Sequence, residues 1–520
     1  MYTYKEKTIG GITMKVVISK FKNRIRKLQT LLLILTILLS SMTITYGSEG
    51  EIGFFGGISE GDYLPKSIEK HVEITKPKTP TYAYKEMVFI SGEPVEVSGT
   101  ITVTIGDDDI LETQSGKYSE KYVIDASSDD ESVVLSRSLQ LETAYRVIDG
   151  QFKKQIVKDS SFSSWEETIT TDSGSFSLDS DSAIFSKATV EDITPGVTYY
   201  NTTLSYSGTY LDGDGNELIM VVAGDIYGYK QPYSKVETQY LNMGIQSDDL
   251  GISMDIKLNP RLEAKKTIYY DESAPYPISF GGTYNQRMER EATLEYEILS
   301  YHPELTPSEL DNSILLTTAN EIEKLPIPEG LDFIEGHWAE DDIKKLYSME
   351  ILTTTPHLGM HFEAMSRGDF VKALCLAMDI DTSKYEDADE DSLQIFGDIP
   401  YDHQFYPYIM GAYDAKLVKG TGEDFDVNVP IKREEAFVIY IRVIGLERLG
   451  VTGSPTTPFV DDAEISSWAK KEIVAGYRLG IIKGNDTGKV LPKSWISKAE
   501  SAAIINRLID YLREEIGKDY

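Results

Sequence analysis

The strongest constraint on the fold of this chain is a two-helix pattern that occurs three times in its last third. Each copy starts at a phenylalanine followed closely by an acidic residue, at Phe333, Phe396 and Phe459, so the copies lie 63 residues apart. A pair of helices cannot bury its own apolar faces, and repeated pairs therefore pack on one another. The pattern predicts an α-helical bundle of three units. These units are residues 333–380, 395–446 and 459–512.

The second helix of each unit starts with a cation. In the third unit, "ISKAESAAIINRL", Ser497 is an N-cap residue and Glu500 completes a capping box, which puts Lys498 at the first helical position. A cation gains nothing from the positive end of the helix dipole. A helix N-terminus with a cation beside it does suit a carboxylate or a phosphate, whereas the simpler interpretation is solvated surface charge. Arg367 and Arg433 occupy the same place in the first two units.

These segments resemble the S-layer homology family. The family pattern is an opening F-x-D, a W-A pair before the first helix, G-I-I-x-G after it, a glycine loop, and I-T-R-A-E at the second helix. The third unit carries the resemblance best, with "FVDD", "SWAKKEI" and "LGIIKGNDTGKVLPKSWISKAE". The second keeps "FGDI" and "AKLVKGTGEDFDVNVPIKREE", and the first keeps "HWAEDDIKKL" and "SRGDF" but loses the glycine loop. The resemblance covers the chain from residue 333 onward and leaves the preceding part unassigned.

The resemblance implies three repeats with pseudo-threefold symmetry, and grooves between repeats that bind anionic secondary cell-wall polysaccharide, often through a pyruvylated terminal sugar. It also implies which residues line the grooves: the cation of the second helix, the aspartate and tryptophan of the opening motif, and a glycine of the loop. Carried over to this sequence, these ligand-binding residues are Arg367, Arg433, Lys498, Asp398, Asp461, Trp338, Trp468, Gly420 and Gly484.

Departures from the family pattern predict unequal grooves and allow one of them to be inactive. Lys498 replaces arginine and lacks the bidentate fork that a guanidinium offers to a carboxylate. Glu335 replaces the aspartate in the first unit, and Phe405 or Tyr406 stands where the second unit is expected to have tryptophan. Lys432 takes the place of a capping Thr or Ser, so the helix after it is expected to be less well capped.

Each groove assignment has a structural alternative. Trp338 and Trp468 would otherwise belong to the core of the bundle, and Asp398 and Asp461 would cap helices or turns. The two groove glycines are expected in the left-handed backbone region after the first helix, whatever else they do. The histidines of this region are interpreted as loop residues and not as a metal-binding set. They are His337, His357, His361 and His403.

Residues 63–301 have the pattern of a β-rich body. Apolar and polar residues alternate in "EVSGTITVTIG", "GISMDIKLNP" and "ATLEYEILSY", and turn signals such as "VIDGQ" and "ITPGV" separate such runs. Short strands with these separators predict an all-β, antiparallel, sandwich-like body of one or two domains. Residues 302–332 are expected to link this body to the helical units.

The body offers one candidate cation site and no defined catalytic site. The turn "LDGDGNE" clusters Asp212, Asp214 and Glu217, whose oxygens would suit calcium. It lacks the twelve-residue spacing of an EF-hand loop, and we favour an acidic hairpin turn. The body contains too many carboxylates for any two to be selected as the acid and base of a glycoside hydrolase.

The N-terminal sequence indicates the location of the chain, and the net charge indicates which partners are disfavoured. Residues 1–47 have the plan of a secretory signal peptide, with a basic segment before the apolar run "LLLILTILL". The alternative is an uncleaved N-terminal anchor, and residues 48–62 are expected to be a linker. No later apolar run has the length of a membrane span, so none is expected after signal cleavage. The net charge of −33 disfavours nucleic acid as a partner. The single cysteine, Cys375, excludes an intramolecular disulfide.

These observations together predict a secreted, multidomain bacterial surface protein that is anchored non-covalently to the cell wall. Its β-rich body would be a structural, S-layer or interaction module, with self-association in a surface layer as a second kind of partnership. The alternative hypothesis is a wall-anchored enzyme that acts on polysaccharide or peptide through a site in the body.

Overall fold

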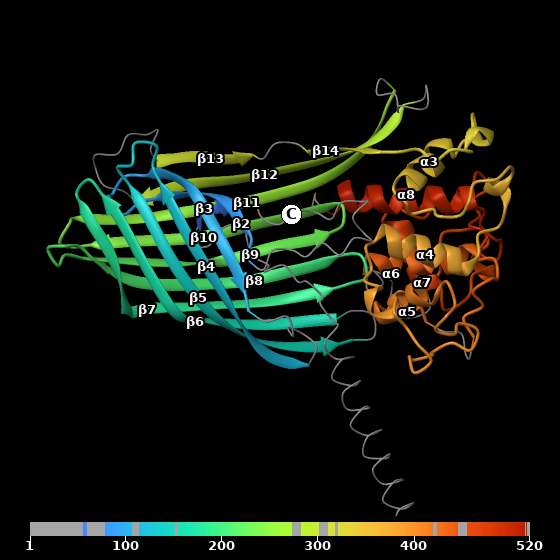
Figure 1. Cartoon of the computed structure of the whole chain (residues 1–520), viewed down its shortest axis with the longest axis horizontal. Coiled ribbons are helices and arrows are strands. Elements are labelled where there is room, and N and C mark those ends of the chain that lie inside the picture. The colour runs from blue at the N-terminus through green and yellow to red at the C-terminus, as the bar shows by residue number, and fades with distance from the viewer. Residues whose placement is uncertain are drawn as a thin grey trace, which may run out of the picture.

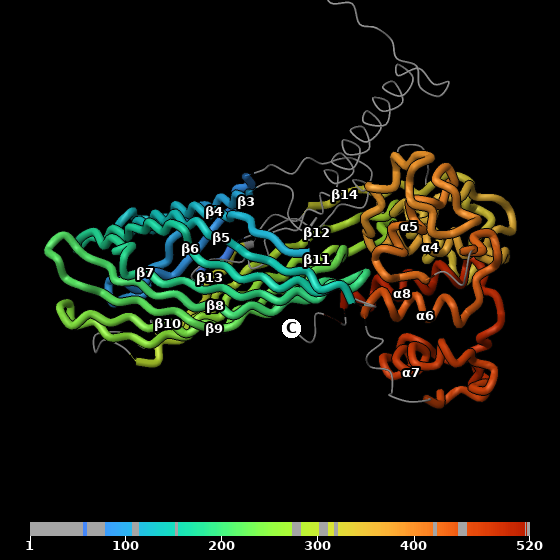
Figure 2. The backbone as a smooth tube through the Cα atoms, turned by 90° about the horizontal axis from the view of Figure 1, so that it is seen from below, coloured from blue at the N-terminus to red at the C-terminus, as the bar shows by residue number. Residues whose placement is uncertain are grey.

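The computed structural model describes most of the chain after residue 78. The described residues are 56–59, 79–106, 114–150, 154–272, 282–300, 310–317, 321–419, 424–445, 455–514 and 516. They form a long antiparallel sheet and, beyond one end of its strands, a group of helices (Figure 1). The perpendicular view shows the same separation (Figure 2). The expected signal peptide and most of the linker after it lie outside the described residues.

One antiparallel sheet of 14 strands makes up the body. Strands β1 to β13 follow one another across the sheet in chain order, and β14 pairs with β12 on the same side as β13. The strands are β1 Ile58–Ser59, β2 Thr81–Val88, β3 Val95–Ile105, β4 Ser115–Ser127, β5 Val134–Asp149, β6 Lys154–Thr171, β7 Gly174–Ile193, β8 Thr198–Leu211, β9 Glu217–Gln231, β10 Ser234–Ser247, β11 Ile252–Asp271, β12 Thr283–Ser300, β13 Asp311–Thr317 and β14 Glu321–Leu325.

The all-β antiparallel prediction is confirmed, but one continuous sheet replaces the expected sandwich of two packed sheets. Neighbouring strands of the sheet are also neighbours in sequence, so no connection passes from one sheet to another. The sheet instead curves until β13 approaches β2 and β1 approaches β11 and β12. It therefore encloses its own apolar face, and strands as long as 20 residues in β7 and β11 contribute to that enclosure.

Parts of both expected linkers are strands. β13 and β14 lie within residues 302–332 and extend the sheet along the edge of β12, while β1 lies within residues 48–62 and pairs with β2. Unpaired backbone groups at a sheet edge attract any nearby extended segment. The link between the body and the helices is therefore shorter than the sequence suggests.

Alternate residues of the strands face the enclosed side of the sheet. In β11, Ile252, Met254, Ile256 and Leu258 are buried and the residues between them are exposed, as the period of a strand requires. Trp165 of β6 is fully buried and lies among a group of aromatic rings. The interior of the sheet thus supplies an apolar core separate from that of the helices.

A buried ionic cluster connects three strands inside the sheet. Arg137 of β5 donates through Nη1 to Glu86 Oε2 of β2 at 2.9 Å and through Nε to Glu167 Oε2 of β6 at 2.8 Å. Tyr84 Oη donates to Glu86 Oε2 at 2.6 Å, and Trp165 Nε1 donates to Glu167 Oε2 at 3.1 Å. Burial raises the pKa of Glu86, against the attraction of the Arg137 guanidinium. Both carboxylates are enclosed and hydrogen-bonded, so we interpret the cluster as a structural contact that holds the three strands together.

The helices of the described region form three consecutive pairs. Their bounds are α3 Glu340–Ser348, α4 Arg367–Ala377, α5 Tyr406–Asp414, α6 Arg433–Val443, α7 Lys470–Arg478 and α8 Lys498–Glu514. The first helix of each pair has nine residues. No described helix combines the length and the apolar character needed to cross a lipid bilayer.

The segments that lead into α4, α6 and α8 hydrogen-bond to one another in a closed ring. Met365 N donates to Ile496 O at 2.9 Å, Ile496 N to Ile431 O at 3.2 Å, and Ile431 N to Met365 O at 2.9 Å. Each segment thus donates to one neighbour and accepts from the other, which is an approximately threefold arrangement. The ring brings the N-termini of the three second helices to one end of the helical part.

The opposite ends of the same three helices rest on the sheet. A helix leaves its last carbonyl oxygens without intrahelical partners, and each helix here has one such oxygen bonded by a donor from the end of the sheet. The pairs are Tyr233 Oη with Ala377 O at 2.7 Å, Gly196 N with Val443 O at 2.8 Å, and Gln231 Nε2 with Leu512 O at 3.1 Å. Eleven residues of helix span about 16 Å, so the ring of N-termini lies on the far side of the helices from the body.

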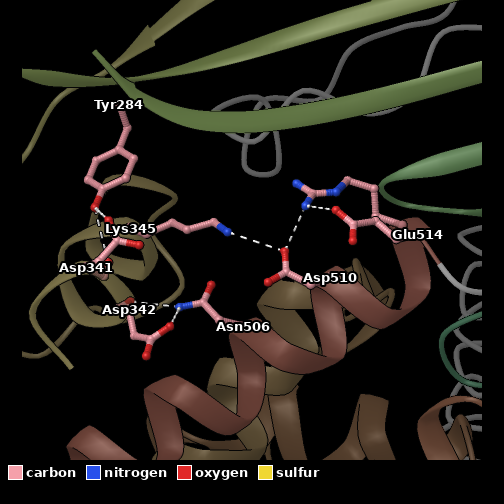
Figure 3. Close-up of polar contacts among 8 residues, drawn as sticks. Tyr284, Asp341, Asp342, Lys345, Asn506, Asp510 and Glu514 are labelled. Carbon is pink, nitrogen blue, oxygen red and sulfur yellow. Dashed lines mark hydrogen bonds and ion pairs between the residues drawn. The ribbon is translucent and has the colours of Figure 1, made fainter. Parts of the chain in front are cut away.

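Helices α3 and α8 add polar contacts to this junction (Figure 3). Tyr284 of β12 donates to the Asp341 carbonyl oxygen at 3.2 Å and also contacts the Asp341 carboxylate. Asn506 of α8 donates through Nδ2 to Asp342 Oδ1 at 3.0 Å. The sheet, the first helix and the last helix are therefore joined into one structure.

Candidate functional site

The three predicted cations are the first residues of α4, α6 and α8, as the sequence predicts. The ring of hydrogen bonds brings their helix N-termini together, and each cation forms an ion pair with a carboxylate of another helix pair. These carboxylates compensate for the unfavourable position of a cation at a helix start. The ion pairs are Arg367–Glu435 at 3.8 Å, Arg433–Glu500 at 2.9 Å and Lys498–Glu363 at 3.0 Å.

The helix caps follow the sequence prediction. Glu500 N donates to Ser497 Oγ at 3.1 Å and Ser497 N donates to Glu500 Oε2 at 2.9 Å, so the predicted capping box of α8 is confirmed. At α6, Lys432 N donates to Glu435 Oε2 at 2.9 Å, but a lysine ammonium has no acceptor to offer in return. Helix α6 therefore keeps half of a capping box, as expected.

A pocket of about 210 Å³ opens beside Arg433. Trp338 of the first helix pair lines it together with residues of the other two pairs, and the Trp338 side chain is 62% exposed. An exposed aromatic face beside an apolar floor suits the C–H face of a sugar ring and contributes contact area at low entropic cost. The residues of the apolar floor are Phe437, Tyr440, Ile482, Ala503 and Ile504.

Positive charge surrounds this pocket although the chain as a whole is acidic. Arg433 donates through Nε to Val490 O at 2.9 Å and through Nη1 to Glu500 Oε1 at 2.9 Å, which uses two of its five N–H donors. Lys483 and Arg507 also line the pocket, and neither forms a hydrogen bond or an ion pair with another described residue. Three cations and one carboxylate therefore favour an anionic ligand.

The pocket beside Lys498 is much smaller, at about 20 Å³, which is room for about one water molecule. Its cation is held by Glu363, which is also bonded by His357 Nε2 at 2.8 Å. The ammonium at this position is therefore already engaged by the protein. The Arg367 guanidinium lies over the Phe425 ring at 5.1 Å from the centroid, as the Arg433 guanidinium lies over the Phe437 ring at 5.4 Å.

The two predicted tryptophans are exposed, and the alternative that they form core is wrong. Trp338 and Trp468 are 62% and 51% exposed, and each directly precedes the N-cap residue of a first helix. The N-cap of α5 is Phe405, so Gln404 holds the corresponding place in the second pair. The prediction that Phe405 or Tyr406 replaces tryptophan is wrong, because both side chains point into the core.

Asp398 and Asp461 shape the loops that precede the second helices. Burial alone would raise the pKa of Asp398, but hydrogen bonds from backbone N–H groups hold that pKa below its usual value. Asp461 fixes the backbone at Val490, whose carbonyl oxygen accepts from Arg433, so this aspartate acts on the pocket through the loop. The bonds are Phe425 N and Val427 N to Asp398 at 2.6 and 3.2 Å, and Val490 N and Leu491 N to Asp461 at 3.0 and 2.8 Å.

Gly484 is required for close packing and not for a left-handed backbone. An added Cβ would lie 3.1 Å from the backbone of Gly488 and 3.2 Å from the ring of Phe459. The left-handed glycines of this unit are Gly480 and Gly488, with φ of +72° and +73°, so the prediction for Gly484 is wrong. Gly420 lies outside the described residues.

The turn at Asp212 has the geometry of an acidic hairpin. Asp212 Oδ1 accepts from Asp214 N at 2.9 Å and Asn216 N at 2.8 Å, and Oδ2 accepts from Asn216 Nδ2 at 2.7 Å. The described residues contain no group of three or more His, Cys, Asp or Glu side chains arranged to hold a metal ion. Glu217 is the first residue of β9. Calcium binding at this turn stays a prediction.

Sequence reasoning missed Tyr440, Lys483 and Arg507 as pocket residues. A signal for two of them exists, because residues seven apart share one face of a helix. Tyr440 lies seven residues after Arg433, and Arg507 lies seven residues after Glu500. Extending each motif by two helical turns would have brought both residues into the candidate site.

Two of the histidines interpreted as loop residues form a close pair. The rings of His337 and His361 lie 4.6 Å apart between centroids, and Phe333 and Phe362 pack on His361. The His361 side chain is 6% exposed, and its Nδ1 has no hydrogen-bond partner among the described residues. Burial, with a smaller contribution from the charge of His337, lowers the pKa of His361.

Acidification is expected to destabilise the chain through His361. Its pKa is lower in the folded chain than the ordinary value of about 6.5, so between these two values the unfolded chain binds more protons and stability falls as pH falls. The midpoint of thermal unfolding, measured between pH 7.5 and 5.5, should fall less in His361→Leu than in the wild type. Equal pH dependence in both would contradict this account.

His357 provides a control of opposite sign. The bond to Glu363 raises the pKa of His357, so its stabilising contribution is present at low pH and is lost as pH rises through the folded pKa. The variant His357→Gln should therefore become more sensitive to acidification than the wild type, whereas His361→Leu becomes less sensitive.

Comparison with known proteins finds similarity to part of the helical region. The S-layer homology domain matches residues 395–437 and 458–502. Exoglucanase XynX of Acetivibrio thermocellus is 29% identical over 34% of this chain and 16% of its own length. The S-layer protein of Bacillus thuringiensis subsp. finitimus is 32% identical over 22% of this chain and 14% of its own length. A cell surface protein of Thermoanaerobacter kivui is 25% identical over 22% of this chain and 15% of its own length.

The chain spans about a sixth or less of the length of these curated relatives. The domain match and the S-layer and cell surface relatives support a secreted, cell-wall-associated location. The C-terminal region of this chain thus contains two segments that match the S-layer homology domain.

Proposed function

We propose that the chain is held non-covalently on a bacterial cell wall by three S-layer homology repeats, residues 333–380, 395–446 and 459–512. The match covers segments of the second and third repeats. The hydrogen-bonded ring through Met365, Ile431 and Ile496 supports including the first, because its leading segment donates and accepts in the same way as the other two.

The ligand proposed for these repeats is an anionic wall polysaccharide bound beside Arg433. The observation that carries this proposal is the pocket itself, where Arg433, Lys483 and Arg507 surround an apolar floor with Trp338 exposed at its side. The net charge of −33 gives no long-range attraction for an acidic polymer. Binding therefore depends on cations positioned locally in a partly desolvated pocket.

The groove residues are proposed to contribute unequally. Arg433 and Trp338 act at the open pocket, and Asp461 positions the loop that contacts Arg433. Lys498 is engaged by Glu363 beside a cavity of about 20 Å³, so this groove is proposed to be inactive. The cyclic arrangement of the repeats relates Arg367 and Trp468 to a third groove.

The body is proposed to be a structural module held away from the wall. The N-termini of the second helices lie on the far side of the helical part from the sheet, and the three C-terminal contacts fix the orientation of the sheet. A structural role is favoured over an enzymatic one because the buried pair Glu86 and Glu167 is held by Arg137 and both pockets described above lie among the helices. Self-association in a surface layer stays a prediction.

Removal of the wall polysaccharide tests the proposed ligand. The full chain is mixed with purified bacterial walls, before and after chemical stripping of the secondary polysaccharide, and the fraction that sediments with the walls is measured. Binding is expected to intact walls and to be lost on stripped walls, because peptidoglycan alone offers no matching acidic sugar. Undiminished sedimentation with stripped walls would contradict the proposal.

A further inference from the structure

The pocket beside Arg433 has a second polar end that the repeat motifs do not include. Tyr440 of α6 and Arg507 of α8 both line the pocket. Tyr440 lies seven residues after Arg433 on its helix, and Arg507 lies seven residues after Glu500. Seven residues correspond to about 10 Å along a helix axis, so this end is displaced by about two helical turns from the ion pair of Arg433 and Glu500.

Tyr440 is a buried polar group without an internal partner. Its side chain is 2% exposed, and its hydroxyl has no hydrogen-bond partner among the described residues. A buried hydroxyl in this condition lowers stability unless another group meets it. Burial raises the pKa of Tyr440, so the hydroxyl remains protonated and available as a donor. Its position in the pocket lining makes a ligand oxygen the natural acceptor.

Arg507 supplies an available cation at the same end. Its side chain is exposed and forms no hydrogen bond or ion pair with a described residue. The Arg507 charge lowers the pKa of the nearby Asp342, but burial has the larger effect and raises that pKa. Asp342 Oδ1 already accepts a hydrogen bond from Asn506 Nδ2 at 3.0 Å. The Arg507 guanidinium therefore keeps its donors for a group outside the protein.

We infer that Tyr440 and Arg507 form a second anion-recognition point, so that the pocket selects a glycan segment with two acidic groups over a segment with one. This inference rests on the proposed function of the pocket. One acidic group lies at Arg433 and Lys483, where the carboxylate of Glu500 leaves one net positive charge, and the other lies at Arg507. The pocket volume of about 210 Å³ is below the usual range for drug-sized ligands, so a short segment fills it and the rest of the polymer lies outside.

Three matched variants of the full chain test the second recognition point on walls. Arg507→Gln is expected to lower affinity for intact walls about tenfold, the value of one charge-assisted hydrogen bond. Lys489→Gln removes the same charge from an exposed loop residue outside the pocket and is expected to change affinity less than twofold. Tyr440→Phe is expected to weaken binding without lowering the thermal midpoint, because no internal hydrogen bond is lost.

Soluble acidic sugars test the selection for two acidic groups. Galacturonate and its oligomers of two and three units serve as competitors for wall binding, with neutral cello-oligosaccharides of equal length as controls. The wild type is expected to be inhibited at lower concentrations by the oligomers than by the monomer, and Arg507→Gln should remove most of that difference. An unchanged difference in Arg507→Gln would overturn the inference.

Different results would overturn the proposed function and the second recognition point. A wild-type chain that does not bind intact walls overturns the proposed function. A wild-type chain that binds, with Arg507→Gln behaving like Lys489→Gln, overturns only the second recognition point.

Discussion

Replacement of Arg433 by glutamine is expected to lower the affinity of the full chain for intact walls by about 10- to 100-fold, whereas Lys498→Gln should change it less than twofold. A hydrogen bond to a charged group contributes about 1.5 to 3 kcal/mol, and the change also leaves Glu500 Oε1 without its cation beside the ligand. Lys498 is already bound by Glu363 next to a cavity of about 20 Å³, so its loss removes little. Binding isotherms on purified walls provide the measurement.

Arg433 also has a structural contact, and its test needs a second variant. Its Nε donates to Val490 O, so Arg433→Gln could disturb the loop as well as the ligand. Arg433→Lys keeps the charge but loses the bidentate fork, and intermediate affinity with an unchanged thermal midpoint is expected. Equal losses for Arg433→Gln and Lys498→Gln would contradict the assignment of the binding pocket.

Replacement of Arg137 by leucine is expected to lower the free energy of unfolding of the body by about 3 to 5 kcal/mol. The variant would leave Glu86 and Glu167 without their cation inside the sheet, where their side chains are at most 6% exposed. The loss should shrink as pH falls, because protonated carboxyl groups cost less to bury. Urea denaturation followed by tryptophan fluorescence, to which the buried Trp165 contributes, measures the free energy of unfolding.

A matched variant separates charge from packing in this cluster. Arg137→Leu combined with Glu86→Gln and Glu167→Gln removes all three charges, and most of the lost stability is expected to return. If the single and triple variants were equally unstable, the cost would come from packing and the ionic explanation would be wrong.

The helical region could be predicted closely because its signals are local. The spacing of Phe333, Phe396 and Phe459 predicts three two-helix units, and the structure has three consecutive helix pairs. The capping box of Ser497 and Glu500 placed the start of α8 correctly. Such signals act within one or two helical turns and do not depend on which elements pack nearby.

The body could be predicted only in part. The alternation in β11 shows which side of the strand is buried, but period two does not say whether a second sheet or the same sheet covers that side. The distinction depends on the curvature that brings β13 towards β2, which no single strand encodes.

The positions of the three cations at helix starts could be predicted from the sequence, but the assembly of residues into one pocket could not. Arg433 and Trp338 belong to different helix pairs and meet in one pocket because the segments that lead into α4, α6 and α8 form a closed ring. The pairing of His337 with His361 likewise depends on the course of the loop between them. Contacts of this kind join residues far apart in sequence, and sequence periodicity carries no information about them.

The binding site can be located in a crystal structure of the full chain with the isolated anionic wall polysaccharide. We expect glycan in the pocket beside Arg433, with a sugar ring against Trp338 and an acidic substituent bonded to the Arg433 guanidinium. Glycan bound only at the Lys498 position or on the β-rich body, with the Arg433 pocket free of sugar, would contradict it.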